Sequence, residues 1–299
     1  MTTAPATVDP YDITARSNGL RRRRLVEKLF GALALVSALV ASGILLVVLG
    51  TTVYKGFSQL DLGFFTKPRP LFGEKGGIAD ALVGSALIVS MAALMAIPVA
   101  VLVAIYMSEY AGPRVSRSLR VVLDVLNGVP AIVVGIFVFG ILVVGNGQKA
   151  AFGAFALAII MLPMVARATQ EILEVVPQSL RHASLALGVT KWRTTWNVIL
   201  PAAIGGILTG VVIAVARIAG ETAPLLFTSA VAANQVSFDV TGALPTLPVT
   251  IYANSESPDP REQAAGWAAA VVLIAFVLVM NILAKFFANR KRRQLEGGS

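Results

Sequence analysis

Residues 176–201 read VPQSLRHASLALGVTKWRTTWNVILP and form a polar stretch between two apolar segments. The stretch predicts two short helices, because Pro177 can open the first helix and Gly188 supplies the left-handed position that often ends one. Thr190 can cap the second helix, and Pro201 can start the apolar segment that follows, where a missing N–H has no cost. The sequence therefore predicts a short helix hinged at a glycine, a lever that could carry a push from a soluble partner into a membrane.

Apolar segments dominate the rest of the chain. Hydrophobic residues make up 56% and charged residues 14% of it, whereas soluble domains carry about 25% charged residues. A spanning helix needs about 20 mainly apolar residues. Six segments qualify to different degrees, and they are 29–53, 81–107, 121–144, 152–166, 202–219 and 264–287. We therefore predict an all-α polytopic membrane protein with six transmembrane helices, interrupted by Pro98, Pro130 and Pro163.

The basic residues predict the orientation of these spans. Most of the 25 lysines and arginines lie in the two termini and in the loops on the same side as residues 176–201. Since cytoplasmic loops carry the excess of basic residues, both termini are predicted to be cytoplasmic, in the plasma or inner membrane. Residues 1–28 and 289–299 then form basic cytoplasmic tails around a single transmembrane domain, residues 29–288.

Several kinds of function are disfavoured by what the sequence lacks. It has no cysteine, and its single histidine, His182, gives no basis for a metal site. No glycine-rich loop followed by Lys-Ser/Thr is present, so the chain is predicted to hydrolyse no ATP and to take its energy from another subunit. The net charge of +9 could suggest nucleic acid, but the basic residues lie beside apolar spans and not among aromatic residues. We therefore predict a lipid-embedded protein that is not an enzyme, with no nucleic-acid partner.

Two charged residues, Arg217 and Glu221, lie at the end of the fifth predicted span, in AVARIAGETAPLLFT. Such residues usually face a bundle interior or a transport path, and a spacing of four places both on one face if the helix continues past Gly220. A guanidinium suits tetrahedral oxyanions. A carboxylate beside it needs a hydrogen-bond donor, which protonated phosphate has and sulfate lacks. The pair therefore favours phosphate, and an internal ion pair that only stabilises the helix is the alternative.

The loop 176–201 also resembles the signature of the permeases of binding-protein-dependent ABC importers. That signature is Glu-Ala-Ala, three residues, Gly, nine residues, Ile, one residue, Leu-Pro, and the spacing from His182 to Pro201 matches it throughout, with His182, Ser184 and Val198 as departures. The resemblance implies a coupling helix that docks into a cleft of an ATPase subunit. Its residues are His182, Ala183, Ser184, Leu185, Ala186, Leu187 and Gly188.

Three further motifs resemble the PstA-like permeases of the phosphate-specific transporter. They are GVPAIVVGIFVFG at 128–140, RIAGETAPLLFT at 217–228 and LPVTIY at 247–252. The resemblance implies the MetI-like architecture of type I importers, with a core at about residues 79–288. It also implies that Arg217 and Glu221 act in transport, and that Arg167 matches a further arginine of the family, although the positive-inside rule explains Arg167 equally well.

The resemblance also implies partners. These are a second, PstC-like permease, a homodimeric PstB-like ATPase that uses ATP and Mg, and an extracytoplasmic PstS-like phosphate-binding protein, while this chain itself binds no cofactor. Three alternatives stay open at this point: a permease for sulfate or molybdate, a secondary transporter, and a signalling scaffold that moves no cargo. The lack of a sequence repeat disfavours the secondary transporter.

Overall fold

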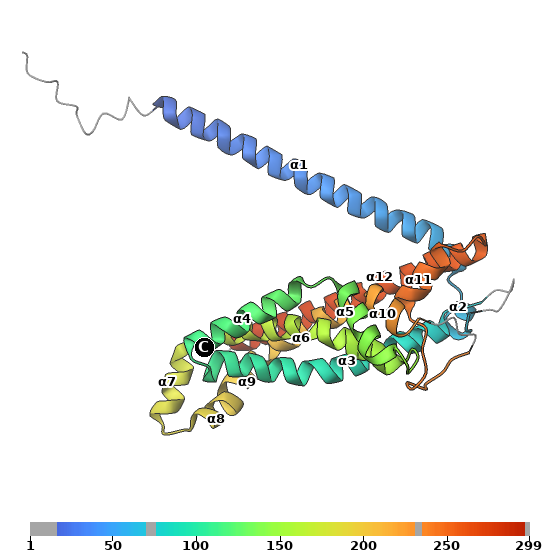
Figure 1. Ribbon diagram of the computed structural model, residues 1–299. Helices are drawn as coiled ribbons and strands as arrows, with labels where there is room; N and C mark the ends of the chain where they lie inside the picture. The colour runs from blue at the N-terminus through green and yellow to red at the C-terminus, as the bar shows by residue number, and fades with distance from the viewer. Residues whose placement is uncertain (1–16, 70–75, 231–234, 297–299) are drawn as a thin grey trace, which may run out of the picture. The chain divides into compact units, whose positions relative to one another are not determined.

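The computed structural model describes residues 17–69, 76–230 and 235–296, and every regular element in these ranges is a helix (Figure 1). The predicted all-α fold class is therefore confirmed. The chain divides into two units, Met1–Thr52 and Val53–Ser299. Parts of the two predicted tails, residues 1–16 and 297–299, lie outside the described residues.

The first unit contains most of α1 (Ser17–Gly56), a helix of 40 residues. The part from Arg22 onward is long and apolar enough to cross a membrane. The predicted span 29–53 lies wholly within this helix, and the arginines before it belong to the same helix. The first predicted span is therefore one continuous helix.

Five helices in the described part of the chain have the length and hydropathy of membrane spans. They are Arg22–Gln59, Ala79–Tyr110, Ala150–Val175, Lys191–Ile218 and Pro260–Phe286. Each contains one of the predicted segments to within one residue. The remaining segment, 121–144, corresponds to two helices bent by 90°, Pro113–Gly128 and Ala131–Val143. The described residues thus hold five candidate spans, or six if the bent pair crosses the membrane as one.

The predicted span 121–144 is not one straight helix, because the chain turns at Val129 and Pro130. Val129 has extended backbone angles, as expected for a residue before proline, and it separates α4 (Pro113–Gly128) from α5 (Ala131–Val138). A π-helical turn, η4 (Phe139–Val143), continues α5. The interruption predicted at Pro130 is therefore confirmed.

The other two prolines behave differently. Pro98 lies inside α3 (Ala79–Ile105) and Pro163 inside α6 (Ala150–Val175), and both helices continue through them. The prediction that these prolines interrupt their spans is wrong in this respect. The fourth span is also longer than the predicted 152–166, because its helix runs on as far as Val175.

The core of the second unit lies between α3 and α6, which pack side by side (Figure 1). Alanines recur at every fourth position of α3, and Ala92, Ala96 and Ala100 are at most 1% exposed. They belong to one apolar cluster with Leu157 and Met161 of α6. Small residues allow two membrane helices to approach closely, so this stripe explains why α3 and α6 form the centre of the unit.

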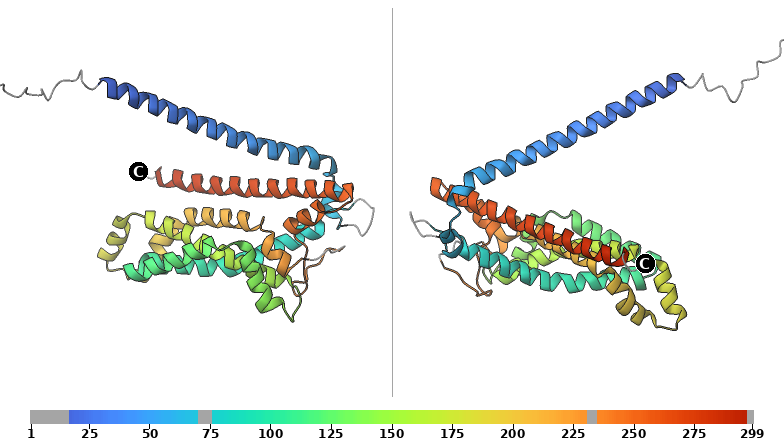
Figure 2. Two further views of the ribbon diagram at one scale, coloured as in Figure 1. Left: turned by 45° about the horizontal axis from the view of Figure 1, so that its top comes forward. Right: turned by 180° about the vertical axis from the view of Figure 1, so that it is seen from behind.

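Shorter helices connect and cover this core. Between α1 and α3 lie η2 (Phe57–Gln59) and α2 (Leu62–Thr66), and after the fifth span lie α10 (Ala223–Thr228) and α11 (Leu247–Ser255). The last helix, α12 (Pro260–Glu296), packs against α11 and against α9 (Leu200–Ile218) (Figure 2). These contacts hold α9, which carries Arg217, between the core and the last helix.

Candidate functional site

The predicted lever at residues 176–201 has a helix on each side of a left-handed glycine. α7 (Gln178–Ala186) starts directly after Pro177, and Gly188 follows its end with φ +76°. α8 (Lys191–Thr194) begins after Thr190, which occupies the N-cap position without a side-chain hydrogen bond. The left-handed position predicted at Gly188 is therefore confirmed.

The expectation that Pro201 starts a separate span is wrong. α8 runs through a π-helical turn, η5 (Thr195–Ile199), directly into α9, so that Lys191–Ile218 is one continuous helical span. Within this turn the Leu200 N–H donates to the carbonyl of Thr195, five residues back. Pro201 cannot donate to the carbonyl four residues back, and the wider π turn before it accommodates the missing bond.

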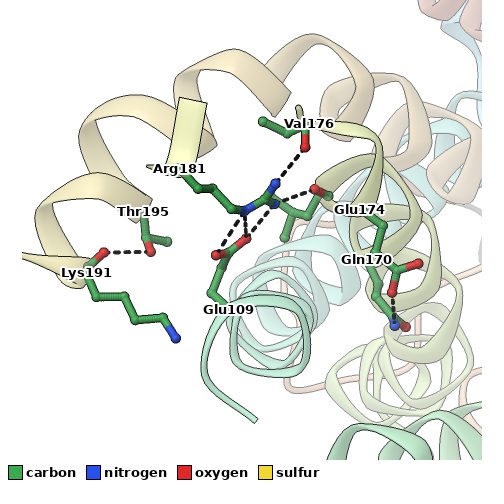
Figure 3. A network of polar contacts seen from close by, with 8 residues as sticks. Glu109, Gln170, Glu174, Val176, Arg181, Lys191 and Thr195 are labelled. Carbon is green, nitrogen blue, oxygen red and sulfur yellow. Dashed lines mark hydrogen bonds and ion pairs between the residues drawn. The ribbon is translucent and has the colours of Figure 1, made fainter. Parts of the chain in front are cut away.

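One arginine ties α7 to the ends of two spans (Figure 3). The Arg181 Nη2 lies 2.8 Å and the Arg181 Nε 3.2 Å from Oε1 of Glu109. Glu109 belongs to η3 (Tyr106–Tyr110), the π-helical turn that ends the second span. Arg181 also donates to two carbonyls at the end of α6, those of Val176 at 2.6 Å and Leu173 at 2.8 Å. Both side chains are nearly buried, with 12% of Arg181 and 5% of Glu109 exposed.

A second contact ties α7 to α8. The hydroxyls of Ser184 and Thr194 lie 2.8 Å apart, and both residues are buried. Lys191 Nζ, at the start of α8, lies 5.2 Å from the centre of the Tyr110 ring, a cation–π distance. The loop is therefore joined to α3, α6 and the α8–α9 helix, and it is not a free connection.

A cavity of about 330 Å³ lies beneath α7. Its lining includes Glu109, Glu174, Arg181, His182 and Lys191. Two leucines of the loop are also exposed: Leu187 to 83%, and Leu185, which lines the same cavity, to 48%. The loop thus offers exposed leucines beside the charged side chains that line the cavity.

A chain of polar contacts connects α4 with α6 near the same end. Arg167 Nε lies 3.1 Å from Asp124 Oδ1, and Arg167 Nη1 donates to Gln170 at 3.3 Å. Gln170 donates to Glu174 at 2.7 Å, and Arg120 forms an ion pair with the same carboxylate at 2.9 Å. Arg167 is thus engaged by a carboxylate across the helix interface.

Arg217 and Glu221 lie on either side of the end of α9. The helix ends at Ile218, a turn follows at Ala219 and Gly220, and α10 begins at Ala223. The helix does not continue past Gly220, so the condition for a shared helical face is not met. Arg217 is exposed and Glu221 partly buried, and the ion pairs among the described side chains do not include one between them. Neither residue is in hydrogen-bond contact with Arg167 in this part of the chain.

The backbone around Glu221 is held closely by α5. A Cβ atom placed on Gly135 would lie 2.7 Å from Cα of Pro224. Gln148 holds the end of α10, since its side chain accepts a hydrogen bond from the Ala230 N–H at 2.9 Å. These contacts fix the direction in which the chain leaves the turn that carries Glu221.

A second cavity, of about 410 Å³, lies at the other end of the unit, lined by residues of α2, α11 and α12. An ion pair between Arg69 and Glu262, 3.2 Å apart, contributes to its wall. In the loop before α11, hydrogen bonds from Thr241 hold the pKa of the exposed Asp239 below its usual value. In the described part of the chain, no three His, Cys, Asp or Glu residues are grouped as a metal site would require.

Sequence reasoning missed the pair of Arg181 and Glu109, which are 72 residues apart. A signal was present, because a carboxylate at the end of an apolar span needs a partner. The sequence does not say which of the nearby arginines supplies it.

Comparison with known proteins assigns the chain to a family. The family described as "Binding-protein-dependent transport system inner membrane component" matches residues 96–293. The phosphate transport system permease protein PstA of Pasteurella multocida is 38% identical over 274 residues, covering 91% of this chain and 97% of that protein. PstA of Yersinia pestis is 39% identical over 274 residues, and PstA 1 of Mycobacterium tuberculosis is 36% identical over 282 residues.

Solved structures support the same fold at lower identity. An inward-facing structure of the MetNI methionine ABC transporter matches 72% of this chain and 94% of its own chain, with a TM-score of 0.57 and 18% identity. An amino acid ABC transporter with histidines matches with a TM-score of 0.53 and 17% identity. The expected MetI-like architecture is therefore confirmed, and the chain belongs to the inner membrane components of binding-protein-dependent transport systems, among the PstA permeases.

Proposed function

We propose that this chain is the membrane-spanning permease subunit of an ATP-driven phosphate importer and that it catalyses no reaction itself. The observation that carries the proposal is the 36–39% identity to PstA phosphate permeases over about 90% of this chain. The names of these relatives favour phosphate over the alternative cargoes, sulfate and molybdate. A signalling scaffold that moves no cargo is not favoured by them either.

The proposed complex contains partners that supply energy and cargo. They are a PstC-like second permease, a homodimeric PstB-like ATPase that binds ATP and Mg, and a PstS-like phosphate-binding protein. Residues 182–188 are proposed to contact the ATPase, and the exposed Leu185 and Leu187 support this role because apolar anchors suit a docking cleft. This chain would bind lipid on its outer faces and no nucleotide.

The proposed orientation follows from the loop. If residues 176–201 meet a cytoplasmic ATPase and the bent pair crosses the membrane as the sixth span, both termini would lie in the cytoplasm, in agreement with the basic residues. The permease domain would then be residues 29–288 in the cytoplasmic membrane, with basic tails at 1–28 and 289–299.

Arg217 and Glu221 are proposed to contact phosphate in the transport path. The Arg217 side chain is exposed within a span, where an unneutralised charge is costly unless a path or a partner subunit covers it. Glu221 lies three residues after the end of α9 and would accept a hydrogen bond from the protonated oxygen of phosphate. Arg167, held by Asp124 near the loop end, is proposed as a second contact for the anion on the cytoplasmic side.

Uptake of radiolabelled phosphate tests this function in cells that contain the other components of the transport system. Arg217→Gln should lower uptake by about tenfold or more at equal membrane expression, since a hydrogen bond to a charged group contributes about 1.5–3 kcal/mol. The matched control is Arg117→Gln, which removes an exposed arginine of α4. Sulfate uptake by the same cells should stay unchanged.

The outcomes separate the parts of the proposal. Wild-type chain that restores no phosphate uptake would contradict the phosphate importer. Equal uptake by Arg217→Gln and Arg117→Gln would remove Arg217 from the path and leave the permease assignment standing. A Glu221→Gln chain that still takes up phosphate normally and excludes sulfate would remove Glu221 as the residue that selects the protonated anion.

A further inference from the structure

Arg181 of α7 and Glu109 of η3 form a nearly buried ion pair that joins two separate helical elements. Arg181 uses all three guanidinium nitrogens: Nε and Nη2 donate to Glu109, while Nη1 and Nη2 donate to Val176 and Leu173. Only 5% of the Glu109 side chain is exposed. Figure 3 shows the guanidinium between the carboxylate of η3 and the last turn of α6.

Such a pair is costly to bury and costly to break. Two charges lose their hydration on burial, and the loss is offset only when the geometry is good and further hydrogen bonds engage the remaining donors, as they do here. The two carbonyls belong to the C-terminal end of α6, where backbone acceptors have no partner within the helix and the helix dipole favours a cation. The contact is therefore rigid: α7 cannot move away from η3 or α6 without leaving a buried charge unpaired.

The pair connects α7 to the two central helices of the unit, α3 and α6. Glu109 lies in a π-helical turn, a form of helix that often marks functional sites. α3 and α6, which the pair joins to α7, are also the two helices that pack most closely in the core. Movement of α7 would therefore reach the centre of the helix bundle by two routes from one side chain.

We infer that Arg181 and Glu109 form the joint that converts displacement of α7 into movement of α3 and α6, and that both are positioning residues for transport. The inference rests on the proposed function, in which an ATPase pushes on residues 182–188. The ATPase would displace α7 through the exposed Leu185 and Leu187, and the buried pair would transmit this displacement to α3 and α6. Contact with phosphate or with the ATPase is not part of this role.

A matched control lies one helix away. Arg120 and Glu174 form an ion pair of similar length, 2.9 Å, between α4 and α6, but their side chains are 42% and 48% exposed. Exposed pairs contribute little to stability. The substitution Arg120→Lys, which keeps the charge of this pair, should therefore leave coupling unchanged.

The test measures phosphate uptake and ATP hydrolysis together in the full complex, reconstituted in lipid vesicles. Glu109→Gln and Arg181→Lys should lower the phosphate moved per ATP hydrolysed by about fivefold or more, the lower end of ordinary coupling between sites. The phosphate concentration that gives half-maximal uptake should stay unchanged, because the path is intact. Arg120→Lys should match the wild type in both quantities. A wild-type ratio in the Glu109 and Arg181 variants, or uptake and hydrolysis that fall in proportion to the complex recovered, would overturn the inference.

A second measurement needs no transport. The chain has no cysteine, so spin labels can be placed at Leu187→Cys on the loop and Val125→Cys on α4, both exposed positions. In the purified full-length chain, Glu109→Gln should broaden the distribution of label distances and Arg120→Lys should not. Equal distributions would overturn the joint. A narrow wild-type distribution that Glu109→Gln broadens, in a chain that transports no phosphate, would instead retain the joint and overturn the proposed function.

Discussion

Replacement of Gly135 by alanine should displace α10 and with it the turn that carries Glu221. The new Cβ would lie 2.7 Å from Cα of Pro224 and 3.3 Å from Cδ2 of Phe227. Carbon atoms pack best at about 3.5–4.0 Å, so α10 must move by roughly 1 Å. The nearest atom belongs to the backbone, so no change of side-chain rotamer relieves the contact. Such overpacking costs about 1–3 kcal/mol.

The matched control is Gly140→Ala, since a Cβ at Gly140 meets nothing within 4 Å. Thermal unfolding of the purified chain in detergent should show a lower midpoint for Gly135→Ala than for Gly140→Ala. Phosphate uptake at equal membrane expression should fall only in Gly135→Ala, because α10 begins two residues after Glu221. If the two variants share one midpoint and one uptake rate, the close packing of α5 on α10 does not position Glu221.

Three further predictions concern the loop and the segment before α11. Gly188→Ala should lower the free energy of unfolding by about 1–2 kcal/mol, because it places a side chain at positive φ. An added side chain has space there and only the backbone is strained, so Gly188→Asn should cost less. Thermal unfolding measures both variants. Ser184→Ala should cost about 1–3 kcal/mol by leaving the Thr194 hydroxyl buried without a partner, and adding Thr194→Val should recover part of the loss in a double-mutant cycle. Hydrogen bonds from Thr241 lower the folded-state pKa of Asp239, so their stabilisation is complete above the unfolded pKa and is lost as the pH falls through the folded pKa. An NMR titration should show a higher Asp239 pKa in Thr241→Val.

Much of the fold follows from hydropathy alone, because lipid leaves few ways to satisfy a buried backbone. Five of the six predicted segments lie within single helices to within one residue. The interruption of segment 121–144 could be predicted from Pro130, but its 90° bend could not, because a count of apolar residues averages across the point where the backbone turns. The predicted end of the fourth span was too early for the opposite reason, since α6 continues past both Pro163 and Arg167.

The candidate site was less predictable because it depends on contacts between distant residues. Gly188 could be predicted, since positive φ is a local property that glycine alone adopts at little cost. The partners of Arg181 and Arg167 could not, because several arginines and carboxylates compete for each role and only packing selects among them. The separation of Arg217 from Glu221 by a turn was foreshadowed by Gly220, but spacing alone could not show that the helix stops before it.

The fifth span begins at Lys191, ten residues before Pro201, and this continuous helix links the loop to Arg217. Because the π turn before Pro201 keeps the helix continuous, one rod of 28 residues runs from Lys191 to Ile218, a length of about 40 Å at 1.5 Å per residue. Its first turn is tied to α7 by the buried contact of Ser184 with Thr194. Its last turn carries Arg217. Under the proposed function, a displacement of the loop thus reaches Arg217 along a single helix, while the pair of Arg181 and Glu109 moves α3 and α6 beside it.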